Sequence, residues 1–168
     1  MKKILGILGL LVFVCVLTAL INPAFLSAYN LQNTLRWTAL FSIISIGVSF
    51  VIITGGIDLS VGSTIGLVGS MLAWLLTVRH WNTPAALATV MGVSLLIGLF
   101  HGFLVTKVKL QPFVVTLCGL LLYRGAARYI TNDQSQGFGS GHDALREMAI
   151  GKIPLFGGFS LPVPFLIM

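Results

Sequence analysis

Residues 53–66, ITGGIDLSVGSTIG, separate two long apolar runs that occupy residues 37–53 and 61–78. The two adjacent glycines of this stretch lack side chains, so the backbone can turn sharply there. Asp58, in the same stretch, is one of only four acidic residues in the chain. The stretch therefore predicts two apolar helices joined by a turn, with a carboxylate placed between them.

The composition around this stretch identifies the class of protein. The chain has 168 residues, of which 57% are hydrophobic and 8% are charged, whereas roughly a quarter of the residues of a soluble domain are charged. Too little polar surface is left to coat a water-soluble body, so we expect a multi-span membrane protein. The net charge of +6 does not indicate nucleic acid binding, because the basic residues stand singly or in pairs at segment ends. Cys15 and Cys118 lie within apolar runs and predict neither a disulfide nor a metal site.

The apolar segments predict an all-α fold, a polytopic transmembrane helical bundle forming a single domain over residues 1–168. A helix needs about 20 residues to cross a bilayer. Five complete segments precede the start of a sixth near Phe159. The complete segments are Ile4–Ile21, Trp37–Thr54, Val61–Val78, Pro84–Thr106 and Phe113–Ile130. A cleaved signal peptide is the alternative for the first segment, but its run of about 18 residues exceeds the roughly 7–15 of a signal core.

The lysines predict how the chain crosses the membrane. Lys2 and Lys3 precede the first segment, and Lys107 and Lys109 follow the fourth. An even number of spans puts both pairs on the same side, and cytoplasmic loops are the ones that carry excess positive charge. The N-terminus is then cytoplasmic, and residues 131–158 form an external loop.

Two interpretations of Asp58 remain open at this point. In the first, Asp58 and Ser60 cap a helix that begins near Val61, after a tight turn. In the second, the turn is a break in helical structure partly within the membrane, where non-helical backbone must be buried or line a water-filled cavity. A carboxylate at such a depth marks a functional site. Arg124 is the other charge within an apolar segment, but the predicted topology puts it toward the opposite face from Asp58.

Small residues at intervals of four predict close packing between helices. They are Gly62, Gly66 and Ser70 in the third segment, and Gly98 and Gly102 in the fourth. Such stripes let a second helix approach closely and carry no chemistry of their own. We expect His101, beside the second stripe, to be a buried histidine that bonds a neighbour.

The predicted external loop contains a short helix. Ser140 or Asp143 can cap this helix, and Gly151 can end it. The helix either lies on the membrane surface or forms a docking surface for a soluble partner. Its His142, Asp143 and Glu147 are more typical of solvated side chains than of metal ligands.

Two motifs resemble those of a known family. GGIDLSVGS at 55–63 and LQPFVVTLCGLLLYRGAA at 110–127 together resemble the membrane permease subunits of bacterial ABC importers for monosaccharides. That group includes the ribose, arabinose, xylose, rhamnose and galactofuranose permeases, and NPAFLSAYNLQN at 22–33 is also similar to it. The resemblance directs attention to Gly55, Gly56, Asp58, Ser60 and Gly62 in the turn, and to Gln111, Pro112, Phe113, Thr116, Arg124 and Gly125 in the fifth segment.

The resemblance implies the other parts of a transport machine. A second permease subunit, identical or different, completes the pathway in the inner membrane, and cytoplasmic ATP-binding subunits power it. A periplasmic or lipid-anchored binding protein delivers the sugar. The chain has no GxxxxGK[ST] phosphate loop, so we expect neither an enzyme nor a cofactor here. Such permeases are about twice as long, with roughly ten spans of about 20 residues each, so we expect the chain to be an N-terminal half.

Three other functions remain as alternatives. A permease of the related branched-chain amino acid importers would give Asp58 a role toward a zwitterionic substrate, although GGIDLSVG is more typical of the sugar branch. An ion-coupled carrier would need no ATPase. A membrane-embedded enzyme would need a nucleophile with its base, or a metal cluster, at one depth. His80, His101 and His142 instead lie in different segments without metal-ligand spacing.

Overall fold

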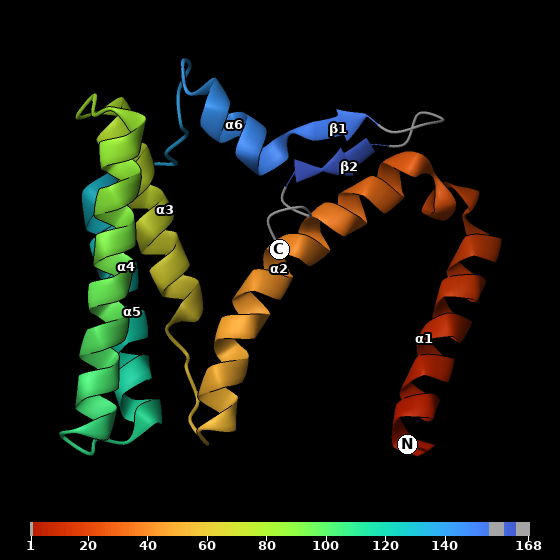
Figure 1. Cartoon of the computed structure of the whole chain (residues 1–168), viewed down its shortest axis with the longest axis horizontal. Helices are drawn as coiled ribbons and strands as arrows, with labels where there is room; N and C mark the ends of the chain where they lie inside the picture. The colour runs from red at the N-terminus through yellow and green to blue at the C-terminus, as the bar shows by residue number, and fades with distance from the viewer. Residues whose placement is uncertain (1, 155–159, 164–168) are drawn as a thin grey trace. The chain divides into compact units, whose positions relative to one another are not determined.

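The computed structural model describes residues 2–154 and 160–163 (Figure 1). The described helices are α1 (Lys2–Ile21), η1 (Pro23–Leu26), α2 (Ala28–Ile53), α3 (Val61–Thr77), α4 (Thr83–Thr106), α5 (Pro112–Thr131) and α6 (Asp143–Ile150), and the described strands are β1 (Lys152–Pro154) and β2 (Ser160–Pro162). The chain divides into two compact units, which are described separately. One comprises Met1–Ile44 and Arg146–Met168, and the other comprises Ser45–Leu145.

Among the described helices, α1, α2, α4 and α5 are long and apolar enough to cross a membrane, and α3 is a shorter apolar helix. The predicted polytopic helical architecture is therefore confirmed. One boundary differs clearly from the prediction, since α2 begins at Ala28 and not at Trp37. The Ser27 hydroxyl accepts a hydrogen bond from the Asn30 N–H at 3.3 Å, and this side-chain cap starts the helix within a polar stretch.

The second unit is built around α3, which packs against both α5 and α4. Figure 1 shows these three helices side by side. One buried cluster joins Leu75 and Leu76 from the end of α3 to Ala86 and Val90 from the start of α4, and α5 buries Val115 and Tyr123. Large apolar side chains stay exposed elsewhere, as at Leu99 on α4. Extensive exposed apolar surface of this kind is typical of helices that face lipid or a partner.

Residues at their starts fix where α4 and α5 begin. The Asn82 side chain accepts a hydrogen bond from the Ala85 N–H at 3.0 Å, and Pro84 lies in the first turn of α4. Pro112 occupies the first position of α5. Proline suits these positions because the first N–H groups of a helix have no partner within it.

The C-terminal part contains the predicted short helix and an unpredicted hairpin. Helix α6 runs from Asp143 to Ile150 and ends before Gly151, as the sequence predicts. Strands β1 and β2 pair antiparallel, with Ile153 opposite Leu161. The predicted start of a sixth span near Phe159 lies mostly outside the described residues. Where the structure describes that region, Ser160–Pro162 form a strand and Val163 is helical.

Candidate functional site

The glycine pair ends α2 through hydrogen bonds typical of a helix C-terminus. The Gly55 N–H donates to the Ile52 carbonyl at 2.9 Å, and the Gly56 N–H donates to the Val51 carbonyl at 3.0 Å. This pair of bonds is the Schellman arrangement, which needs a left-handed residue just after the helix. Gly55 supplies it with φ 77°, a conformation that costs glycine little. The pair therefore stops α2 and directs the chain into a non-helical segment.

Residues 56–60 are non-helical and lead into α3. Helix α3 has 17 residues, so it is about 25 Å long, whereas the hydrocarbon core of a bilayer is about 30 Å thick. Helix α3 alone is thus shorter than a crossing needs, and a third crossing stays a prediction. Five non-helical residues differ from a tight turn, and their position within the membrane stays a prediction.

The Asp58 carboxylate holds the residue that precedes α3. Its Oδ1 atom accepts one hydrogen bond from the Ser60 N–H at 2.8 Å and another from the Ser60 hydroxyl at 2.7 Å. Ser60 is only 2% exposed, and its own side chain makes no capping bond to α3. As a cap, the carboxylate is expected to accept hydrogen bonds from N–H groups at the start of this helix. It instead satisfies both donors of one buried residue at the entry to that helix.

The motif of the fifth segment lies against this turn. The Thr116 hydroxyl is 3.2 Å from the Ile57 carbonyl and 2.9 Å from the Pro112 carbonyl, so it is shared between residues 56–60 and its own helix. Thr116 is only 5% exposed. A Cβ atom built on Gly56 would lie 3.8 Å from the Cβ atom of Pro112. The structure thus brings the two sequence motifs together, although Ile57 and Thr116 are 59 positions apart.

A second polar contact joins α5 to α4. The Tyr123 hydroxyl lies 2.8 Å from Nε2 of His101. The predicted bond of His101 to a neighbour is therefore confirmed, whereas its side chain is half-buried and not fully buried as predicted. The helices are close here, because a Cβ atom built on Gly119 would lie 2.8 Å from the His101 ring.

Tyr123 was not singled out from the sequence. Thr116, Gly119 and Tyr123 are spaced as i, i+3 and i+7, and all three are buried. That spacing places them on one face of a helix. The pattern was therefore available in the sequence as a signal for this residue.

The remaining residues of the fifth-segment motif lie apart from these contacts. Gln111 precedes the first residue of α5, and its side chain makes no capping bond. Phe113 is 46% exposed. Arg124 and Gly125 are also exposed. Their roles stay predictions.

The charged residues of α5 do not reach the turn. Among the described residues, the salt bridge joins Arg128 to Asp133 at 2.5 Å, and none joins Asp58 to Arg124. The hydrogen bond from Arg128 holds the pKa of the Asp133 carboxyl below its ordinary value. Arg128 lies in the last turn of α5, where a positive charge interacts favourably with the helix dipole.

The small-residue stripes face no neighbour within the described part of the chain. A Cβ atom built on Gly62, Gly66, Gly98 or Gly102 would meet no atom there within 4 Å. Ser70 is half-buried. A helix that packs closely on these stripes would therefore have to come from outside the described residues. Close packing at the stripes stays a prediction.

Comparison with known proteins identifies the family of the chain. Residues 30–160 match the family described as branched-chain amino acid transport system / permease component. The chain belongs to this family. The xylose transport system permease protein XylH of Escherichia coli (strain K12) is 41% identical over 111 residues, which cover 66% of the chain and 28% of that relative.

Two ribose import permease proteins, both named RbsC, match more of the chain. The protein of Haemophilus influenzae is 33% identical over 162 residues, covering 94% of the chain and 48% of that relative. The protein of Escherichia coli (strain K12) is 34% identical over 165 residues, covering 97% of the chain and 49% of that relative. The chain thus spans about half the length of the ribose permeases that it matches. No solved structure matches the chain.

The family agrees with the resemblance found in the motifs. The relatives are named as transport permeases and not as enzymes. Together with the apolar helices, membership of this permease family supports a multi-pass protein of the inner membrane.

Proposed function

We propose that the chain forms part of the membrane permease of an ABC importer that carries a monosaccharide across the inner membrane. The observation that carries the proposal is the similarity to ribose import permeases over 94% and 97% of the chain. The xylose permease, at 41% identity, supports the same class of substrate. The chain would supply one wall of the pathway, and it would not hydrolyse ATP.

In this function the turn at residues 55–60 lies beside the transport pathway. A neutral sugar needs no charged partner, so the carboxylate of Asp58 serves to fix the backbone. Its two bonds to Ser60 and the bond of Thr116 to Ile57 support this role, because they hold non-helical backbone in one shape. The contact between Tyr123 and His101 would keep α4 in place beside the same segment.

The proposal includes partners and an orientation. A second permease subunit would complete the pathway, cytoplasmic ATP-binding subunits would drive it, and a binding protein would deliver the sugar from outside. The N-terminus and the lysines after α4 would be cytoplasmic, with residues 131–158 external. The positive charges at Lys107 and Lys109 support this orientation.

A permease for branched-chain amino acids is the second candidate, because the family description names that class. Deletion of the gene in its own host, followed by uptake of labelled ribose, xylose and leucine, separates the two. Loss of uptake of a sugar, restored by the gene on a plasmid and with leucine uptake unchanged, is the expected result. Loss of leucine uptake alone would establish the second candidate instead.

A further inference from the structure

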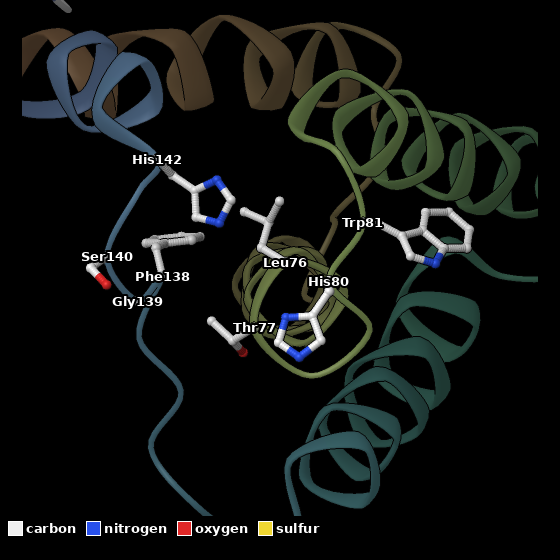
Figure 2. Close-up of a pocket in the computed structure, with 8 residues that line it drawn as sticks. All are labelled: Leu76, Thr77, His80, Trp81, Phe138, Gly139, Ser140 and His142. Carbon is white, nitrogen blue, oxygen red and sulfur yellow. The ribbon is translucent and has the colours of Figure 1, made fainter.

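A cavity of about 350 Å³ opens where α3 ends and α4 begins, and the chain that leads into α6 closes one side of it (Figure 2). Its volume lies within the range of about 300–1,000 Å³ that is typical of small-molecule sites. All of its lining residues belong to the unit Ser45–Leu145. The proposed function makes no use of this cavity.

Contacts on both sides hold the shape of the cavity. Gly139 has φ 67°, and a Cβ atom built on it would lie 3.3 Å from Cγ2 of Thr77. The segment before α6 therefore lies directly on the last turn of α3. Nδ1 of His142 lies 3.2 Å from the hydroxyl of Thr83, which ties the same segment to the start of α4. On the opposite side, the Trp81 N–H donates to the Leu75 carbonyl at 3.0 Å.

The lining side chains combine aromatic rings with hydroxyl and imidazole groups. Figure 2 shows Phe138 and His142 on one side of the cavity, with Thr77 and His80 on the other. Since Nδ1 of His142 is engaged by Thr83, its Nε2 atom is left for a ligand. In one tautomer of the ring Nε2 donates a hydrogen bond to the ligand, and in the other it accepts one.

The same lining excludes other classes of ligand. It contains no Asp or Glu, so the ammonium group of an amino acid would enter without an opposite charge, which is costly. Among the described residues there is no group of three or more side chains suited to a metal ion. A neutral molecule with an apolar face and a rim of hydroxyl groups fits better, because a ring can pack on that face while imidazole and hydroxyl groups bond the rim.

We propose that this cavity is a binding subsite for a neutral monosaccharide, with the sugar ring on Phe138 and its hydroxyl groups bonded to His142, His80 and Thr77. The proposal rests on the proposed function. It places a sugar-binding site at the opposite end of α3 from the turn that contains Asp58. In the proposed orientation this end is external, so the subsite receives the sugar before the pathway does.

The test measures binding directly on the purified full chain in lipid nanodiscs. Ribose, xylose and leucine are titrated separately and followed by saturation-transfer NMR. We expect weak binding of at least one sugar, no binding of leucine, and an affinity about five- to tenfold lower in Phe138→Ala and His142→Ala, as the loss of one good contact predicts. Phe103→Ala is the matched control, because Phe103 and Phe138 are 56% and 49% exposed and only Phe138 lines the cavity.

The outcomes separate this proposal from the proposed function. Sugar binding that is unchanged in both cavity variants overturns the subsite and leaves the transport proposal standing. If neither ribose nor xylose binds, the subsite is also overturned. The uptake assay still tests transport on its own. Leucine binding that is lost in His142→Ala overturns both. Circular dichroism of each variant shows whether the helices are retained, and His142→Gln, which keeps a hydrogen-bonding group, should recover part of the affinity.

Discussion

Asp58 satisfies both donors of one serine that the fold buries, and this explains why a carboxylate stands in an apolar part of the chain. Ser60 is 2% exposed, so its N–H and hydroxyl cannot turn to water. A buried donor without a partner costs about 1–3 kcal/mol. The charge of Asp58 is not needed for this role, since any oxygen acceptor at the same place would serve.

The first prediction follows from that distinction. Asp58→Asn keeps an oxygen that can accept from Ser60, so it should retain most transport in the assembled importer. Asp58→Ala removes the acceptor and should lower the free energy of unfolding by about 1–3 kcal/mol, with impaired uptake. Thermal unfolding and sugar uptake measure the two effects. If Asn damaged uptake as much as Ala while the importer still assembled, the charge itself would be required.

Gly119 offers a second test at the residue scale. A methyl group there would lie 2.8 Å from the His101 ring and 3.0 Å from the Tyr123 ring. Gly119→Ala should therefore break the bond between these side chains and destabilise the chain by about 1–3 kcal/mol, as overpacking does.

Gly125→Ala is the matched control for this test, because it lies on the same helix and its methyl group meets no described atom within 4 Å. Alanine in an exposed helical position should stabilise by roughly 0.5–1 kcal/mol relative to glycine. Thermal unfolding in detergent compares the two variants. If Gly119→Ala were as stable as Gly125→Ala, the packing of α4 on α5 at this point would contribute nothing to the free energy of unfolding.

A helix was predictable from the sequence where the pattern of residues within that segment alone indicates it. Apolar runs located the spans, and the structure adds that Asn82 caps α4 and Pro112 begins α5. The early start of α2 was missed because its cap at Ser27 lies in a polar stretch that resembles a loop. The hairpin was missed because strands of three residues carry too little pattern to recognise.

The site was predictable only in part, for a physical reason. The type of residue at Asp58 and Ser60 predicted a capped helix start. The partner of Thr116 was not predictable, because its bond to Ile57 joins residues 59 positions apart and depends on how α3 packs on α5. The contact between His101 and Tyr123 likewise depends on the packing of α4.

Thr116 tests whether α5 holds the non-helical segment. Thr116→Val removes the hydroxyl that reaches the Ile57 carbonyl and should cost about 1 kcal/mol. Thr131→Val is the matched control, since Thr131 is similarly buried and its hydroxyl bonds only carbonyls of α5. Hydrogen exchange at residues 57–60 should become faster in Thr116→Val alone. Equal exchange in both variants would show that the segment is held by other contacts.

We expect the small-residue stripe of α3 to contribute to packing against other subunits in the assembled importer. Gly66 has open space around it in the described chain, so Gly66→Leu should leave the unfolding temperature of the purified chain unchanged. In the complete importer, the larger side chain would hold a neighbouring helix away, and copurification of the partner subunits should fall. Normal assembly with Gly66→Leu would show that this stripe faces lipid.

The course of the whole chain through the membrane is the last prediction. Helix α5 has 20 residues, about 30 Å, which matches the hydrocarbon core, so Lys107 and Ser140 should lie on opposite sides. The positive charges around Lys107 favour the cytoplasm for that side. With Cys15 and Cys118 first replaced by serine, Ser140→Cys should react with an impermeant maleimide in intact cells. Lys107→Cys should react only after the membrane is permeabilised. The reverse pattern would invert the orientation, and with it the external position of the cavity, while labelling of both sites from outside would mean that α5 does not cross.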